Sequence, residues 1–455
     1  MSGYSPHTDA DREQMLAAIG INSVEDLFTP IDPSLRSFSL DIPPALAEND
    51  LQRMARDLAA RNQDTLSHPC FLGAGNYQHW IPAAVPAITS RGEFLTSYTP
   101  YQPEISQGTL QVMYEFQSLI AALTGLDVSN ASLYDGATAL AEAVTMAKTI
   151  TGRSRIVLAG AIHPQYRDVL ATYGTTVTLV DTDLPDRLTV LPADLDAALG
   201  DDVAAVVVQS PNFLGAIEDS KALADVAHQH GVLLIAGFNP IALGILTAPG
   251  EVGADIAYGE GQSLGVGQMF GGPALGLIAT RSTYLRHLPG RIAGAARDNR
   301  GQDGFVLTLQ AREQHIRRER ASSNICTNEA VCALAATVYL SLVGKCGLRE
   351  LAHTCTQRAH YAARQLEQVQ GYHVVGEGPF FHEFVLECPD DTMVINRDLL
   401  SAGIIGGYPL GRYDARLANH MLVCVTEQQN RSDIDRLVAT LAGRRSATAE
   451  TRGKE

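Results

Sequence analysis

The chain has 455 residues, of which 45% are hydrophobic and 18% charged, and it carries a net charge of −16. A chain of this length is expected to form two or three domains with sizeable cores, and its low charge content predicts extensive burial, including burial against a second chain. The acidic balance excludes nucleic-acid binding, which needs a basic field to displace counterions, and it argues equally against a role on anionic membranes.

Residues 1–65 are predicted to form short helices. Thr8 precedes Asp11 by three residues, as Ser23 precedes Asp26, so that each hydroxyl can accept a hydrogen bond from a free N–H at a helix start. The start has no apolar signal core, and the chain has no uninterrupted run of about 18 apolar residues. We therefore expect no secretory peptide, no membrane span and a cytoplasmic location.

The seven cysteines are scattered and form no CxxC pair, which predicts reduced thiols in a cytosol. His228 and His230 lie two residues apart, which places them on different faces of a helix. Because no zinc-ligand spacing is present, the sequence predicts no metal site.

Residues 66–108 form a long irregular stretch rich in proline, glycine and aromatic residues. Irregular segments of such length inside a compact domain tend to be functional. The glycines of 73–75 are expected to allow positive φ in a turn, and those of 271–273 to turn the chain into a strand.

Between residues 130 and 280, short β-rich runs alternate with helical segments. Most runs are apolar throughout, as expected for strands covered on both faces, and the alternation predicts a mostly parallel sheet with right-handed crossovers. The predicted strands are 155–160, 176–181, 203–210, 232–237, 254–259 and 274–280.

The predicted fold is therefore α/β, with a large domain over residues 66–322, a smaller C-terminal α+β domain over 323–445, and a frayed tail over 446–455. A mostly parallel seven-stranded sheet followed by a small α+β domain is the layout of the large pyridoxal-phosphate fold, the aspartate-aminotransferase type or fold type I. Fold alone does not fix function.

The cofactor of that fold needs backbone N–H groups at a helix start for its phosphate. Asp135, Gly136, Ala137 and Thr138 open the helix that follows residues 130–134. Small residues there allow close approach of an anion, while an ordinary capped helix explains the same pattern.

The cofactor also needs a lysine amine for its Schiff base and a carboxylate for its pyridine nitrogen. The strand at 232–237 ends without an acid, and residues 259–273 hold Gln262 and no lysine. The only lysines are Lys148, Lys221, Lys345 and Lys454, and none lies near that segment in the sequence. We therefore expect no cofactor to be bound covalently by this chain.

Three long motifs and three shorter ones carry a resemblance to a known family. The long motifs are FLGAG (71–75), YTPYQPEISQG (98–108) and NASLYDGATAL (130–140), and the short ones are GEGQ (259–262), FGGP (270–273) and SNICTN (323–328). From Pro6 to about residue 440, the chain resembles the P-protein family of the glycine cleavage system, in the form of subunit 1 (alpha) of the two-chain glycine dehydrogenase (decarboxylating).

The resemblance implies an oxidoreductase that decarboxylates glycine through pyridoxal phosphate and passes the aminomethyl group to the lipoyl arm of the H-protein. It implies that subunit 2 supplies the cofactor lysine, that two copies of each subunit form a heterotetramer, and that Gln262 stands where the lysine is absent. No catalytic residue is assigned to this chain.

The segment that follows Tyr98 supplies the candidate site residues. We expect Tyr98, Thr99, Tyr101, Gln102, Glu104, Ser106 and Gln107 to line the substrate channel or the lipoyl path, or else to pack against the partner. Tyrosines offer apolar faces with polar tips, and a glutamine both donates and accepts hydrogen bonds. Two other functions stay open: a non-catalytic scaffold that stabilises subunit 2, and a stand-alone pyridoxal-phosphate enzyme that uses Lys148 or Lys221.

Overall fold

The computed structural model describes residues 6–36, 41–269, 271–321 and 323–444. Phe270 and the predicted tail at 446–455 lie outside the described residues. The chain divides into two units, Met1–Asn62 and Gln63–Glu455, and each is described by itself.

The first unit consists of short helices, as predicted: α1 (Asp9–Ile19), η1 (Val24–Phe28), α2 (Pro33–Arg36) and α3 (Glu48–Ala59). Thr8 and Ser23 each form a capping box with the aspartate three residues later, which confirms both predicted caps. None of the described residues of this unit is buried, so its helices have no core of their own.

The second unit is built on a seven-stranded sheet with the order β1-β7-β6-β5-β4-β2-β3. Strands β3, β2, β4, β5 and β6 are parallel, while β7 and β1 are antiparallel to their neighbours. The bounds are β1 (Val128–Ser129), β2 (Arg155–Ala159), β3 (Val177–Val180), β4 (Val203–Ser210), β5 (Leu233–Phe238), β6 (Ile256–Glu260) and β7 (Gly276–Thr280). The predicted fold class and its six predicted strands are confirmed.

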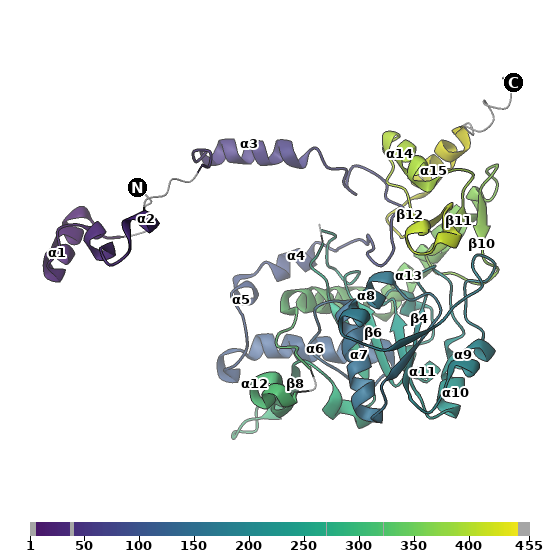
Figure 1. Ribbon diagram of the computed structural model, residues 1–455, viewed down its shortest axis with the longest axis horizontal. Coiled ribbons are helices and arrows are strands. Elements are labelled where there is room, and N and C mark those ends of the chain that lie inside the picture. Colours follow the sequence, from purple (N-terminus) through teal and green to yellow (C-terminus); the bar gives the residue numbers. More distant parts are fainter. Residues whose placement is uncertain (1–5, 37–40, 270, 322, 445–455) are drawn as a thin grey trace. The chain divides into compact units, whose positions relative to one another are not determined.

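Helices cover both faces of this sheet (Figure 1). Successive side chains of a strand point to opposite faces, and in β4 Val207 packs in the core beneath α7 while Val206 packs in the core beneath α10. Burial on both faces explains why the strands are apolar throughout. The helices before and between the strands are α4 (Ala84–Thr89), α5 (Gly92–Leu95), α6 (Gln107–Thr124), α7 (Gly136–Thr151), α8 (Pro164–Thr172), α9 (Pro192–Ala198), α10 (Ser220–Gln229) and α11 (Pro249–Val252).

A second, antiparallel sheet with the order β10-β11-β13-β12 follows later in the chain. It packs with the end of α13 and with α14 and α15 in a separate core (Figure 1). The elements are α13 (Ala330–Leu366), β10 (His373–Val375), β11 (Glu383–Glu387), α14 (Thr392–Ser401), β12 (Tyr408–Pro409), β13 (His420–Cys424) and α15 (Arg431–Gly443). The two units do not divide at residue 322, and the boundary between a large and a small domain there stays a prediction.

A hairpin of β8 (Ile292–Arg297) and β9 (Asp303–Thr308) lies between the two sheets in the sequence. The basic stretch after it forms only single turns: η5 (Gln310–Arg312), α12 (Gln314–Arg317) and η6 (Arg318–Arg320). Arg317, Arg318 and Arg320 are exposed, as expected for a solvated basic segment.

Helix α13 is long and apolar enough to span a membrane by length and composition alone, with a mean hydropathy of 1.7 over its best stretch, half of which is buried within the described residues. Thr337 and Ser341 interrupt the apolar run, which is why counting consecutive residues does not reveal it. Their hydroxyls donate to backbone carbonyls one turn earlier. A core helix meets the same criterion, and α13 packs against α6 and α4.

Candidate functional site

A narrow cavity lies where β4, β5 and β6 end, at the edge where open α/β sheets bind their ligands. It encloses about 50 Å³, room for a few water molecules at roughly 10–15 Å³ each. None of its described lining residues is a lysine or an arginine. They are Gly75, Tyr77, His163, Tyr166, Gln209, Pro211, Gly237, Phe238, Asn239, Pro240, Tyr258, Gly259, Glu260, His382 and Glu383.

Tyr258 occupies the space that an acidic side chain at the end of β5 would need. It pairs with Gly237 across β5 and β6, and a Cβ atom on Gly237 would lie 2.6 Å from its phenol oxygen. Tyr258 is 1% exposed, and burial raises its pKa well above the usual range. Its hydroxyl has no hydrogen-bond partner among the described residues. A side chain at position 237 would therefore collide with the Tyr258 ring.

Glu260, the last residue of β6, places its carboxylate at the start of α7. One oxygen accepts the Gly136 N–H at 2.9 Å, and the other accepts the N–H groups of Gln262 and Leu275 at 2.9 and 2.8 Å. Burial raises the pKa of this carboxyl to about 7, although the three hydrogen bonds act in the opposite direction. A helix start favours an anion, and in this chain Glu260 supplies it.

The predicted helix-start residues do open α7, and Asp135 caps the helix. The Asp135 carboxylate accepts the Thr138 N–H at 2.7 Å, and the Thr138 hydroxyl accepts the Asp135 N–H at 3.2 Å. A Cβ atom on Gly136 would lie 2.3 Å from the Tyr166 hydroxyl, and Ala137 is buried. The N–H groups of Gly136 and Thr138 are therefore satisfied by the chain's own carboxylates.

Gln262 is buried just beyond β6, and both polar atoms of its side-chain amide are hydrogen-bonded. Its carbonyl oxygen accepts the Tyr77 N–H at 3.0 Å, and its amide nitrogen donates to the Val266 carbonyl at 2.8 Å. The side chain thus holds the 73–77 turn against the loop that follows β6. Its correspondence to a lost lysine stays a prediction.

The opposite wall of the cavity joins the 73–77 turn to the second sheet. The Glu383 carboxyl accepts the Ala74 N–H and the Tyr77 hydroxyl, both at 2.7 Å, and burial raises its pKa to about 7. His163 donates from Nε2 to the Ala74 carbonyl at 2.9 Å, and burial lowers its pKa. The φ angles of Ala74 and Gly75 are 58° and 99°, which confirms the expected turn, although one of its positive angles falls on the alanine.

The described lysines lie away from this cavity. Lys148 donates to the Thr175 hydroxyl at 3.2 Å, Lys221 pairs with Asp225, and Lys345 is exposed on α13. None of them lines the cavity, and Lys454 lies outside the described residues.

The segment from Tyr98 to Gln107 forms an exposed surface with anchored ends. Tyr98 and Tyr101 are 81% and 67% exposed, and Gln102 and Glu104 are exposed as well. The Gln107 side chain accepts the Phe305 N–H and donates to the Phe305 carbonyl, both at 2.9 Å.

At the other end of this segment, the Thr99 hydroxyl accepts a hydrogen bond from Arg291 at 3.3 Å. Ser106 precedes α6 without a side-chain cap. None of the seven candidate residues lines the cavity of this chain, so their predicted channel role would have to be filled on another surface.

Sequence reasoning missed the side chains that fill the cavity, chiefly Tyr166, Tyr258 and Glu383. They come from α8, β6 and β11, and nothing in their local patterns marks them as neighbours. For Glu260 a signal was present, since an acid two residues before Gln262 lies at the end of a strand, the edge at which α7 begins.

The sheet order and the cavity at the carboxyl ends of its parallel strands define a protein with the fold of the type I pyridoxal-phosphate enzymes. A solved structure of C-DES in which glycine is covalently linked to the PLP cofactor shares this fold, with a TM-score of 0.59 at 15% identity over 84% of this chain and 100% of that chain. A family model described as the glycine cleavage system P-protein matches residues 2–441. The chain belongs to this family.

Relatives agree over nearly the whole length of the chain. A probable glycine dehydrogenase (decarboxylating) subunit 1 from Thermomicrobium roseum is 52% identical over 98% of this chain and 100% of its own length. A crystal structure of glycine decarboxylase (P-protein) of the glycine cleavage system, in inhibitor-bound form, is 43% identical, with a TM-score of 0.89 over 96% of this chain and 99% of that chain.

Proposed function

We propose that this chain is the subunit of a two-chain glycine dehydrogenase (decarboxylating) that does not carry the cofactor, and that it works only in complex with a second subunit. In this proposal the complex decarboxylates glycine through pyridoxal phosphate on subunit 2 and passes the aminomethyl group to the lipoyl arm of the H-protein. Two copies of each subunit form the complex, and the seven free cysteines support a reducing compartment such as the cytoplasm.

The residues that line the cavity are the observation that supports this proposal. They do not fit pyridoxal phosphate: none of the described lysines lines the cavity, Tyr258 stands in place of an acid, and the Glu260 carboxylate occupies the helix start that a phosphate would need. A second anion beside a buried carboxylate would be repelled. The chemistry of the family therefore has to be supported by another chain.

The exposed segment at 98–107 supports a contribution to the partner's site. Three large side chains of the segment, those of Tyr98, Tyr101 and Ile105, are exposed, and tyrosine is enriched at interfaces. Gln107 and Thr99 hold the ends of the segment, so Tyr98, Tyr101 and Gln102 project from a fixed base. In this proposal they line the path of glycine or of the lipoyl arm.

Co-expression with subunit 2 tests the division of labour. We expect the two chains to co-purify and to release carbon dioxide from glycine, whereas either chain alone is inactive. Full activity of subunit 2 alone would favour the scaffold alternative. If this chain alone, supplied with pyridoxal phosphate, gave a borohydride-sensitive absorption and released carbon dioxide from glycine, the proposal would be wrong.

Variants of the segment test its role within the assembled enzyme. Tyr101→Phe and Gln102→Ala are expected to raise the KM for glycine or for the lipoyl substrate, or to lower kcat, by about tenfold, which corresponds to about 1.4 kcal/mol of lost interaction. Tyr173→Phe, an exposed tyrosine that ends α8, is the matched control. Unchanged kinetics in both segment variants, with assembly intact, would remove the channel role and leave the subunit assignment standing.

A further inference from the structure

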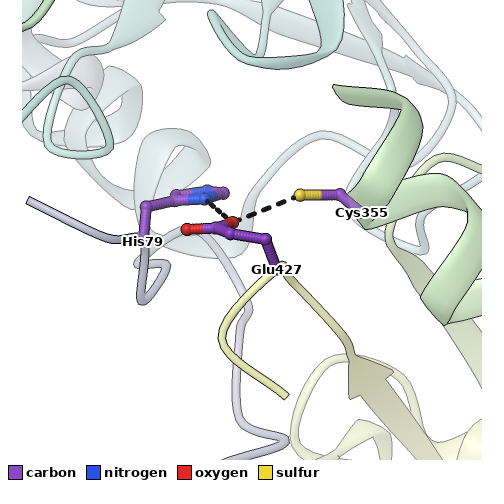
Figure 2. Close-up of side chains that lie close together, drawn as sticks. All are labelled: His79, Cys355 and Glu427. Carbon is purple, nitrogen blue, oxygen red and sulfur yellow. Dashed lines mark hydrogen bonds and ion pairs between the residues drawn. The ribbon is translucent and has the colours of Figure 1, made fainter. Parts of the chain in front are cut away.

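His79, Cys355 and Glu427 form a buried cluster outside the cavity described above (Figure 2). The His79 Nδ1 atom lies 2.8 Å from one Glu427 carboxylate oxygen, and the Cys355 Sγ atom lies 3.4 Å from the same oxygen. Potential ligand atoms of all three residues lie within 4.8 Å of one another. An imidazole nitrogen, a thiol and a carboxylate therefore converge on one point.

The three residues come from distant parts of the chain. His79 lies in the segment before α4, Cys355 lies within α13, and Glu427 follows β13. The Cys355 side chain is completely buried, and those of His79 and Glu427 are 2% and 13% exposed. A link between these residues would fasten the 75–83 segment and the end of the second sheet to α13.

The hydrogen-bond pattern argues against a nucleophilic site. Both the thiol and the imidazole contact the carboxylate, and among the described residues no hydrogen bond joins the thiol to the imidazole. A cysteine nucleophile needs access for a substrate as well as an adjacent base, whereas the Cys355 side chain is completely buried. The two donors instead converge on one Glu427 oxygen, so potential ligand atoms of all three side chains gather around one point.

We propose that His79, Cys355 and Glu427 bind one divalent transition-metal ion of the zinc type. Nitrogen, sulfur and oxygen ligands of these kinds hold zinc at about 2.0–2.3 Å in a tetrahedron, which separates the ligand atoms by roughly 3.3–3.8 Å. The observed N–O and S–O separations of 2.8 and 3.4 Å need to lengthen by at most about half an ångström, and the N–S separation, which is within 4.8 Å, has to settle at about 3.6 Å.

The charge balance suits a buried site. On binding, the thiol loses its proton to solvent, and the imidazole carries its hydrogen on Nε2 so that Nδ1 can bind the ion. Nε2 is buried and has no hydrogen-bond partner among the described residues. The thiolate and the carboxylate then neutralise the two positive charges of the metal. A neutral assembly avoids the large cost of an uncompensated charge in the interior.

Neighbouring groups hold the carboxylate ligand in place. The backbone N–H of Trp80 donates to the other Glu427 oxygen at 2.6 Å, and Arg358 donates to the backbone carbonyls of Glu427 and Gln429. Such supporting contacts orient metal ligands. An open depression lined by Trp80, Thr354 and Glu427 reaches the residue that carries the carboxylate ligand.

Cobalt binding to the assembled complex tests the site. The complex of this chain with subunit 2 is stripped with a chelator, loaded with Co²⁺ alone and desalted, and its metal content and near-ultraviolet absorption are measured. We expect one Co²⁺ more per copy of this chain than in Cys355→Ser, together with a thiolate-to-cobalt charge-transfer band that the variant lacks. Cys346→Ser removes an exposed thiol of the same helix and is expected to retain both.

A zinc titration followed by thermal unfolding provides the second measurement. Zn²⁺ is expected to raise the unfolding temperature of the wild type and of Cys346→Ser but not that of Cys355→Ser, with an affinity loss of at least about 100-fold, because changes to outer-shell partners alone cost up to that amount. Should Cys355→Ser fail to assemble, His79→Gln takes its place. Equal metal content and equal zinc response in wild type and ligand variant, or no bound metal in either, would overturn the proposal.

Discussion

Glu260 offers the most direct test of the proposal that this chain fills the place of a phosphate with its own carboxylate. In Glu260→Gln an NH2 group replaces one of the two carboxylate oxygens. This donor then faces another donor, either the Gly136 N–H or the N–H groups of Gln262 and Leu275, and the hydrogen bonds on that side are lost. Losing a hydrogen bond to a charged, buried acceptor costs about 1.5–3 kcal/mol. Glu260→Ala leaves all three N–H groups without this acceptor, so its cost is expected to be larger, about 3–5 kcal/mol.

The measurements are thermal unfolding and hydrogen exchange of the assembled complex at about pH 8, because a carboxyl whose pKa is raised to about 7 is mostly ionised there. The raised pKa means that the ionised Glu260 carboxyl itself costs the fold stability at this pH, so the loss of the hydrogen bonds is read from hydrogen exchange. The first turn of α7 should exchange faster in both variants than in the wild type. Glu377→Gln, an exposed glutamate without a hydrogen bond or ion pair among the described residues, is the control and should match the wild type.

Inorganic phosphate supplies the decisive comparison. Since Glu260→Ala frees N–H groups at the start of a long helix, phosphate should raise the unfolding temperature of this variant more than that of the wild type. The reasoning fails if phosphate stabilises the wild type equally. It also fails if neither variant changes the exchange of the first turn of α7.

Two further changes test the same cavity. Burial raises the pKa of Glu383 from 4.5 to about 7, so the folded state binds the proton of this carboxyl more tightly than the unfolded state does. The contribution of Glu383 to the free energy of unfolding is therefore fully present below about pH 4.5 and is lost as the pH rises through about 7. The stability of Glu383→Gln relative to the wild type should therefore increase between about pH 5 and pH 8, by at most about 3 kcal/mol. The measurement is the urea unfolding midpoint of both proteins across this pH range. A constant difference between the two midpoints would contradict the expected increase. Gln262→Lys is expected to give no borohydride-sensitive absorption with pyridoxal phosphate, because Tyr258 and Glu260 still fill the cavity, and a spectroscopically visible imine would show that the amine alone was missing.

Much of the sheet could be predicted because each strand carries its own signal. A strand that is covered on both faces is apolar along nearly its whole length, and this pattern identifies β4 and β5 in the sequence. The two-residue β1 gives no such signal, since two residues are too few for a pattern. The caps at Thr8 and Ser23 were predictable because a cap depends on residues three apart in the chain.

For the cavity at the end of the sheet, the sequence could reveal which residue types are missing but not which side chains line it. A missing lysine is visible in a string of residues, but the closeness of Glu383 to Ala74 depends on the packing of the whole second unit. The cluster of His79, Cys355 and Glu427 has no recognisable ligand spacing for the same reason, since its members are brought together by three separate elements. Sequence reasoning therefore expected no metal site, because it searched for ligands close together in the chain.

In the proposed function, the filled cavity is a stronger reason for dependence on a partner than the absence of the lysine. Losing the lysine alone would leave an open, polar hollow, with the N–H groups at the start of α7 unsatisfied, and such groups are costly to bury. Tyr258 and Glu260 fill that space and satisfy the helix start. In the proposed function, an amine introduced at position 262 would therefore recover no cofactor site unless both side chains were also removed, and removing Glu260 would leave three backbone N–H groups without their acceptor.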